Sequence, residues 1–288
     1  GSHYDYYRGP SPFSESEAVA IRDLALEHDF VFSIVWHSSR SGRLSEKVFT
    51  SWNWEGNKPS PDLDVMKGIA DSFSDLMEKE DGTGSYLSVL SGSRNGKLHD
   101  WFYRETGCIQ YLVECGTSNL QPDSLLIEST ISRTKPAMVY LLDRSIGYYT
   151  DAGQVTGIVY DASTNTPISG AEVEIEEHSG SVLKPRLTNE FGRYRRILDA
   201  GTYHLNITRK GYIPIRQSIT ANNSGITNVD FFLEPAPMHL VRVDLDYGVT
   251  GNLPYEVHCL VINDFDTDTL LINDSYIDLS LSEGSYQL

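Results

Sequence analysis

Two short apolar segments, each ending in a side chain that can bind a proton or a metal, constrain the fold most strongly. The first reads FVFSIVW and is followed by His37, and the second reads CIQYLV and is followed by Glu114. Helical patterns precede and separate them, and this alternation predicts an α/β layer with parallel strand pairs. His37 and Glu114 then lie at carboxyl ends of strands, where open α/β sheets bind their ligands.

Four segments have the apolar spacing or the end signals of helices. Ser14 and Glu17 have the spacing of a capping box, and Gly107 is a typical residue to end a helix. Pro136 should kink or break the last helix because it has no amide hydrogen to donate. The predicted helices cover 14–28, 61–80, 98–107 and 122–146, with a strand at 30–36, a loop at 37–60, an extended piece at 86–90 and a strand at 108–115.

The pattern changes after about Tyr149 to short alternating strands such as QVTGIVYD, AEVEIEE and GTYHLNITR. Turn signals such as NEFG and DAG separate them at the spacing typical of a β-sandwich. EPAPM then resembles a stiff linker, and alternation resumes after it. We therefore predict an α/β domain at 1–149, an all-β sandwich at 153–234 and a further short β unit at 238–288.

The composition disfavours two classes of partner. The chain has 288 residues and a formal net charge of −17. An acidic surface repels phosphate backbones and anionic lipids, so binding to nucleic acid or to a membrane surface is not expected. No apolar run approaches the ~20 residues that a membrane-spanning helix needs. Three cysteines cannot form a disulfide framework, and they leave the compartment open.

Glu114 is an unusual residue for an apolar strand. Gln110, Leu112 and Glu114 share one face of the strand, and a buried carboxylate is unfavourable unless it is paired or bound to a metal. A salt-bridged glutamate at a strand end is the common structural interpretation. A functional site shared with His37 is the alternative, and the residues alone leave both open.

Three motifs occur in order over roughly residues 4–148: YYRGPSPFSESEAVAI, FVFSIVWHS and LHDWFYRETGCIQYLVECGT. Together they resemble the carboxyl-terminal half of the catalytic domain of zinc carboxypeptidases of the carboxypeptidase A/B type. That family has a Tyr-x-Gly segment, a Pro-x-Ser-Glu helix start, a strand ending in a zinc-binding histidine, an Asp-Trp pair and a strand ending in the catalytic glutamate. The resemblance implies a partial, mixed-sheet α/β/α domain.

The resemblance also implies a catalytic pair. His37 matches the third zinc ligand of the family, and Glu114 matches the general base. A catalytic zinc takes three protein ligands and one water, and it lowers the pKa of that water and polarises the scissile carbonyl. Glu114 would take the proton of the water and hand it to the leaving amine.

Four further residues match positions near the substrate in that family. Ser38 follows the ligand histidine, Asp100 opens the helix that borders the specificity pocket, and His99 falls at the floor of that pocket. Tyr86 is the best match to the tyrosine that caps the substrate carboxylate, although its spacing to Asp100 is longer than usual in the family. The aromatic stretch FTSWNW (49–54) is either a substrate-facing lip or an anchor for its loop.

The chain departs from the family in its zinc ligands. The other two ligands of the family form a His-x-x-Glu upstream of the Tyr-x-Gly segment, together with the arginines and the asparagine that hold the substrate. None of the eight histidines here has Glu three residues later. We therefore expect only one of the three Zn²⁺ ligands in this chain, and we expect the chain to be the distal part of a longer polypeptide.

A second resemblance covers 153–234. PISGA, FGRY, AGTY and KGY recur here at the spacing of the carboxypeptidase regulatory-like, transthyretin-like β-sandwich, in which glycines permit the tight turns. In extracellular carboxypeptidases this non-catalytic module follows the catalytic domain directly, as it does here. His178 and His204 are interpreted as ordinary strand or turn residues.

The two resemblances imply a secreted or cell-surface zinc metallocarboxypeptidase that hydrolyses the carboxyl-terminal peptide bond of a peptide or protein. A hydrolase of cell-wall peptides from the same family is an alternative, because the arginine that determines substrate specificity in that family lies upstream of these motifs. A non-catalytic adhesion or scaffold protein, whose peptidase-like layer has lost its zinc, is the alternative from another class.

Overall fold

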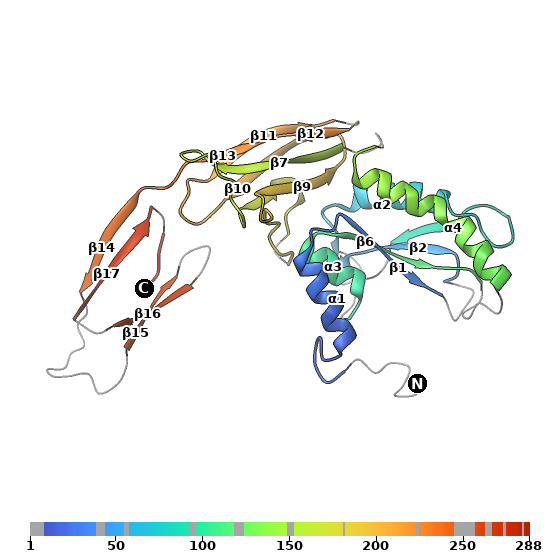
Figure 1. Cartoon of the computed structure of the whole chain (residues 1–288), viewed down its shortest axis with the longest axis horizontal. Coiled ribbons are helices and arrows are strands. Elements are labelled where there is room, and N and C mark those ends of the chain that lie inside the picture. Colours follow the sequence, from blue (N-terminus) through green and yellow to red (C-terminus); the bar gives the residue numbers. More distant parts are fainter. Residues whose placement is uncertain are drawn as a thin grey trace.

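The computed structural model describes residues 9–38, 44–54, 58–90, 92, 96–117, 124–148, 153–180, 182–222, 225–244, 257–262, 267–272, 275–283 and 285–288. We call 9–148 the α/β segment, 153–234 the β segment and 238–288 the C-terminal segment. Figure 1 shows the β segment between the other two, and all the helices labelled there belong to the α/β segment.

A four-stranded mixed sheet forms the centre of the α/β segment, in the order β1-β6-β2-β5. β1 runs parallel to β6, and β2 runs antiparallel to β6 and parallel to β5. The predicted parallel pair is therefore confirmed. The strands are β1 (Phe32–His37), β2 (Lys47–Thr50), β5 (Leu87–Leu90) and β6 (Ile109–Glu114), with a small separate ribbon of β3 (Asn53–Trp54) and β4 (Lys58–Pro59).

The predicted loop at 37–60 is wrong in one part, because it contains β2. Val48 and Thr50 are fully buried while Lys47 and Phe49 are half-buried, which is the alternation of a strand with one face in the core. β2 is stabilised by pairing with β5 and β6, which lie forty residues or more later in the chain, so the local sequence carries little signal for it.

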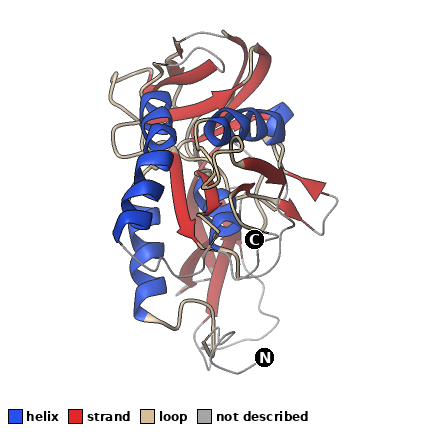
Figure 2. Ribbon diagram, turned by 90° about the vertical axis from the view of Figure 1, so that its right-hand side faces the viewer, coloured by secondary structure: helices blue, strands red, loops and turns tan. Residues whose placement is uncertain are grey.

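Helices lie on both sides of this sheet (Figure 1). α2 (Leu63–Asp75) and α4 (Ser124–Ser145) join the larger apolar core with the inward face of β6, whose members there are Ile109, Tyr111 and Val113. α1 (Ser16–Glu27) and α3 (Leu98–Thr106) meet in a smaller cluster of Ala25, Phe102 and Cys108. Figure 2 shows helices along one side of the molecule.

The predicted capping box is wrong, and so is a break of the last helix at Pro136. The capping box does not form: α1 begins at Ser16 after Glu15 and has no side-chain cap, because Ser14 Oγ donates to the Glu15 carboxylate instead. α4 is also not broken at Pro136 but continues to Ser145. Buried residues on the next turns, including Tyr140 and Leu141, hold it against the core and offset the missing hydrogen bond.

The β segment has two sheets around one core. One sheet has the order β11-β10-β8, and the other has β12-β7-β13 with β9 also paired to β7. Val173, Leu205 and Ile207 from the first sheet share a cluster with Val155 and Phe231 from the second. The predicted strand AEVEIEE ends early, at Ile175, and a 3₁₀ turn follows it. The elements are β7 (Gly153–Asp161), β8 (Glu172–Ile175), η1 (Glu176–His178), β9 (Arg193–Leu198), β10 (Gly201–Thr208), β11 (Ile215–Ala221), β12 (Ile226–Asn228) and β13 (Phe231–Leu233).

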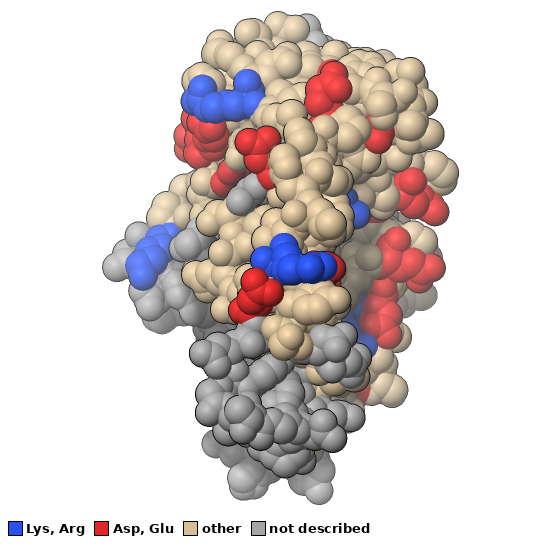
Figure 3. Space-filling model, turned by 90° about the vertical axis from the view of Figure 1, so that its left-hand side faces the viewer, with Lys and Arg blue, Asp and Glu red and all other residues tan. Residues whose placement is uncertain are grey.

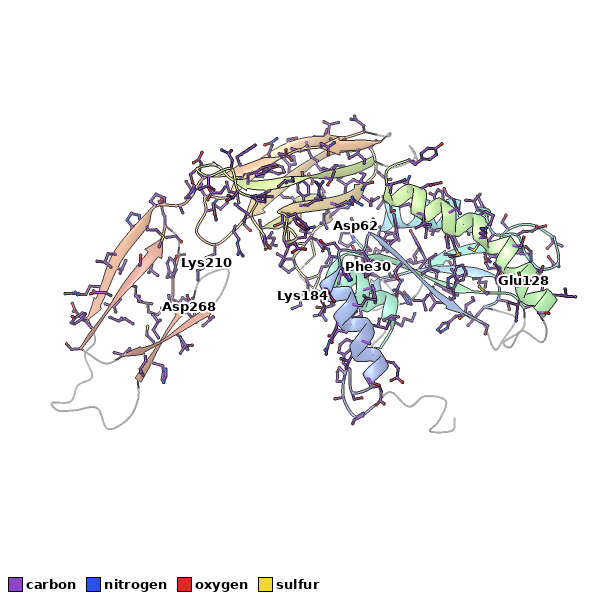
Figure 4. The ribbon with its side chains drawn as sticks, viewed as in Figure 1. Phe30, Asp62, Glu128, Lys184, Lys210 and Asp268 are labelled. Atoms are coloured by element: carbon purple, nitrogen blue, oxygen red, sulfur yellow. The ribbon has the colours of Figure 1, made fainter. Side chains whose placement is uncertain are left out.

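The C-terminal segment forms two antiparallel ribbons. They pair β14 (Met238–Asp244) with β17 (Tyr276–Ser282) and β15 (Val257–Ile262) with β16 (Thr267–Ile272). Lys210 of the β segment forms an ion pair with Asp268 at 3.1 Å, where the two segments approach each other (Figure 4).

The described part of the chain contains no helix that is both long enough and apolar enough to cross a membrane. On the face drawn in Figure 3, basic side chains form small separate groups among acidic ones.

Candidate active site

The carboxyl ends of β1 and β6 bring His37 and Glu114 together. The two strands are parallel and in register, with His37 opposite Glu114, so both side chains project from the same face of the sheet. His37 Nδ1 lies 3.8 Å from Glu114 Oε1. The imidazole is 55% exposed and the glutamate side chain only 11% exposed, so the pair lies at the rim of the sheet with the carboxylate on the inner side.

The Glu114 carboxyl has the environment of a proton acceptor. Burial raises its pKa above the ordinary value, and the neighbouring His37 lowers it in part. Its Oε2 atom is buried and accepts no hydrogen bond from the described residues. A carboxylate with a raised pKa and a free oxygen, beside an imidazole, is a typical functional-site environment.

Tyr86 lies next to the same edge but is buried. Its side chain is in the core, where the residue is only 2% exposed, and its hydroxyl accepts a hydrogen bond from Gly116 N at 3.0 Å. Burial raises the pKa of Tyr86 to about 12. Gly116 is two residues beyond Glu114, so Tyr86 supports the end of β6 from within the core.

His99 and Asp100 lie in the first turn of α3, and both are buried. Asp100 Oδ1 accepts a hydrogen bond from Trp52 N at 2.8 Å. Trp52 follows β2, which starts opposite Glu114 at Lys47 and runs away from it. Asp100 therefore anchors the chain after β2, and the sheet register does not bring this anchor to the rim where His37 and Glu114 meet.

Ser38 directly follows His37 and is half-buried. The residues after it, 39–43, lie outside the described residues. Trp52 is buried as well, so within FTSWNW this tryptophan is an anchor of its loop.

The described residues do not supply a complete zinc site. Imidazole and carboxylate are suitable zinc ligands, and a catalytic site needs three protein ligands. No group of three or more His, Cys, Asp or Glu side chains that could hold a metal occurs in the part of the chain that the structure describes. His37 thus fits one ligand position, and the donor set is incomplete.

Two parts of the chain match known protein families. Residues 2–137 match the family described as zinc carboxypeptidase, and residues 154–234 match the carboxypeptidase regulatory-like domain. Residues 2–137 are thus similar to zinc carboxypeptidases. Both family resemblances noted in the sequence are therefore confirmed.

The matching relatives are carboxypeptidases. Carboxypeptidase D of Mus musculus is 25% identical over 237 residues, which is 76% of this chain and 16% of that protein. The catalytic chain of carboxypeptidase N of Rattus norvegicus is 24% identical over 198 residues, which is 66% of this chain and 41% of that protein. The chain thus spans less than half the length of these curated relatives.

Among solved structures, a streptococcal ancillary pilin covers 48% of this chain and 49% of its own, at 13% identity and a TM-score of 0.29. A score this low supports no argument about fold or function.

Sequence reasoning missed a polar cluster where the α/β and β segments meet. Asp62 Oδ1 pairs with His178 Nδ1 at 2.6 Å, and Asp62 Oδ2 accepts the hydroxyl of Tyr103 at 2.7 Å. The interpretation of His178 as an ordinary turn residue is incomplete, because it bonds to another segment. Its partner is 116 residues away, and no local pattern marks the pair.

Proposed function

We propose that the α/β segment contributes the distal half of a metallocarboxypeptidase active site, which hydrolyses the carboxyl-terminal peptide bond of a peptide or protein. One observation carries this proposal. His37 and Glu114 face each other at the carboxyl ends of adjacent parallel strands, inside residues that match the zinc carboxypeptidase family. Substrate sites of α/β sheets form at such edges.

Glu114 is the general base in this proposal. It takes a proton from the attacking water, the water oxygen bonds to the scissile carbonyl carbon, and the proton passes to the amine as the C–N bond breaks. The raised pKa and the free Oε2 of Glu114 support this role.

His37 is one zinc ligand and binds through a neutral ring nitrogen. Bound zinc would supply Lewis-acid polarisation of the carbonyl and an activated water. The two further ligands that a catalytic zinc requires would come from residues outside the described part of the chain, as in the His-x-x-Glu of the resembling family.

The substrate-contacting roles of Ser38, Tyr86, His99 and Asp100 remain proposals from the resemblance. The burial of the last three favours a supporting role: Tyr86 holds Gly116 and Asp100 holds Trp52. We propose that the protein is secreted or displayed at the cell surface, because the regulatory-like module follows the catalytic domain in extracellular carboxypeptidases.

A non-catalytic adhesion or scaffold protein is the second candidate. The incomplete donor set within the described residues favours it. A hydrolase of cell-wall peptides uses the same catalytic residues and differs only in substrate.

The test compares His37→Ala with His28→Ala in a polypeptide that includes a His-x-x-Glu segment. His28 is an exposed histidine at the end of α1 and serves as the control. Zinc content and release of the terminal amino acid from a peptide panel are measured. We expect His37→Ala to lose both and His28→Ala to keep both. Full zinc content and hydrolysis in His37→Ala would reject the role of His37, and no zinc in the unmodified protein would favour the non-catalytic alternative.

A further inference from the structure

The carboxyl end of α3 is capped by the β segment. The last carbonyls of a helix have no partner within the helix. In α3, Gly107 N donates to Tyr103 O at 3.1 Å, and the β segment supplies further donors. Arg186 donates from Nη2 to Tyr103 O at 2.7 Å and from Nη1 to Arg104 O at 3.1 Å. Lys184 N donates to Arg104 O at 3.0 Å. The guanidinium also brings positive charge to the negative end of the helix dipole.

Gly107 makes this cap possible. It follows α3 with φ +76°, and a Cβ at this position would lie 2.5 Å from Arg186 Nε. The glycine therefore ends the helix and also admits the arginine against its backbone.

The carboxyl end of α4 is held in the same way. Arg195 Nη1 donates to Ser145 O at 3.0 Å. Gly147 follows the helix with φ +76°, and a Cβ there would lie 2.6 Å from Ile226 Cγ1 of β12. The carboxyl ends of α3 and α4 thus each accept a hydrogen bond from an arginine of the β segment. The glycine after each helix also packs closely against a side chain of the β segment.

The amino end of α2 is the third contact, and Figure 4 shows Asp62 where the two segments meet. Asp62 is the N-cap residue of α2, but its carboxylate caps no amide of that helix. The Asp62 carboxylate instead accepts hydrogen bonds from His178 and Tyr103. Because an ionised carboxylate can only accept, the His178 Nδ1 atom carries the proton.

The apolar cores are asymmetric. Leu183 and Ile197 of the β segment pack against the α/β core. The partly buried neighbours of the β core are Tyr212, Ile215 and Val229, all from the β segment itself. Within the described residues, side chains of the β segment pack against the core of the α/β segment. Among these same described residues, no apolar side chain of the α/β segment packs against the core of the β segment.

We propose that the β segment folds around its own core without the α/β segment. It then holds the α/β segment by capping the carboxyl ends of α3 and α4 and by binding the Asp62 side chain at the amino end of α2. The regulatory-like module is then a structural support for the peptidase-like layer. This inference concerns folding and does not rest on catalysis.

The experiment is native-state hydrogen exchange on the full chain and on three variants. Arg186→Met removes the α3 cap, and Arg195→Met removes the α4 cap. Arg193→Met is the matched control, because Arg193 is an exposed arginine two residues away on the same strand, β9. A lost hydrogen bond to a charged donor corresponds to about 10- to 100-fold less protection.

We expect amides of α3 and β6 to exchange about 10- to 100-fold faster in Arg186→Met, and amides of α4 to do so in Arg195→Met. Amides of β7 and β10 should stay more protected than those of the α/β segment in both variants, because they exchange only when the β core also opens, and the control should match the unmodified chain. In the extreme form of this result, the amides of the α/β segment exchange completely while the amides of the β segment remain protected. Equal protection of both segments in the unmodified chain, or no change in either variant, would overturn the proposal. Zinc and hydrolysis do not enter the readout.

Discussion

Asp62 shows at the scale of a single residue how the two segments are coupled. Burial alone would raise the pKa of Asp62, but hydrogen bonds from His178 and Tyr103 and the charge of Arg196 outweigh burial and lower it below the ordinary value of 3.8. A carboxyl with a lowered pKa in the folded state adds stability above its unfolded pKa. That stability is lost as the pH falls through the lowered folded value.

We therefore predict that Asp62→Asn reduces the free energy of unfolding at neutral pH and flattens its decline on acidification. Denaturant unfolding from about pH 7 down to the lowest pH at which the chain stays folded measures this, because the stability is lost as the pH falls below the unfolded pKa and through the lowered folded one. Asp64→Asn, in the first turn of the same helix and exposed, is the control and should keep the pH dependence of the unmodified chain. Parallel pH curves for Asp62→Asn and the unmodified chain would show that the Asp62 contacts are energetically neutral.

The sequence predicts some residues of the site better than others. His37 and Glu114 each follow an apolar run, and the shared edge of parallel strands is enough to predict that they meet. His178 gives no such signal, because its role depends on Asp62 in another segment. The burial of Tyr86 and Asp100 was also not predicted, since tyrosine and aspartate occur both at surfaces and in hydrogen-bonded interiors.

At the scale of elements, local signals predicted the helices and the longer strands, and pairing between distant segments decided the rest. β2 was missed because four residues carry little periodicity and its partner β6 is far away in the sequence. The capping box at Ser14 was predicted from spacing alone. In the structure the Ser14 hydroxyl donates its hydrogen bond to a nearer acceptor, the Glu15 carboxylate.

Gly107 tests the cap of α3 directly. Gly107→Ala places a Cβ at positive φ, which costs about 1–2 kcal/mol, and it also displaces Arg186. Gly82→Ala is the matched control, since Gly82 has φ +70° and the nearest atom to its Cβ would be 3.8 Å away. We predict that Gly107→Ala lowers the free energy of unfolding by at least about 1 kcal/mol more than Gly82→Ala does, because a charged hydrogen-bond donor is lost.

The same comparison in an Arg186→Met background separates strain from displacement. There the excess cost of Gly107→Ala should shrink, because the arginine that the Cβ meets is absent. An excess that is absent from the start, or that is unchanged without Arg186, would contradict the cap.

At the scale of the whole molecule, the β segment should be an independent folding unit. The buried members of its core all lie within 155–233, and within the described residues the strands of its two sheets pair with one another. We predict that residues 153–234 expressed alone unfold in one cooperative transition, by circular dichroism and by fluorescence. Gradual or non-coincident transitions would place part of its stability in the α/β or C-terminal segment.

At the same scale, the proposed function rests on Glu114. The decisive measurement is kcat for release of a terminal amino acid by Glu114→Gln, in a polypeptide that carries the complete zinc ligand set, with zinc content measured in the same sample. Glu27→Gln, exposed on α1, is the control. A glutamine cannot accept the proton of the water, so we predict unchanged zinc and a kcat lower by about 10²–10⁴-fold. A kcat near that of the unmodified protein, at equal zinc, would contradict the assignment of Glu114 as the general base.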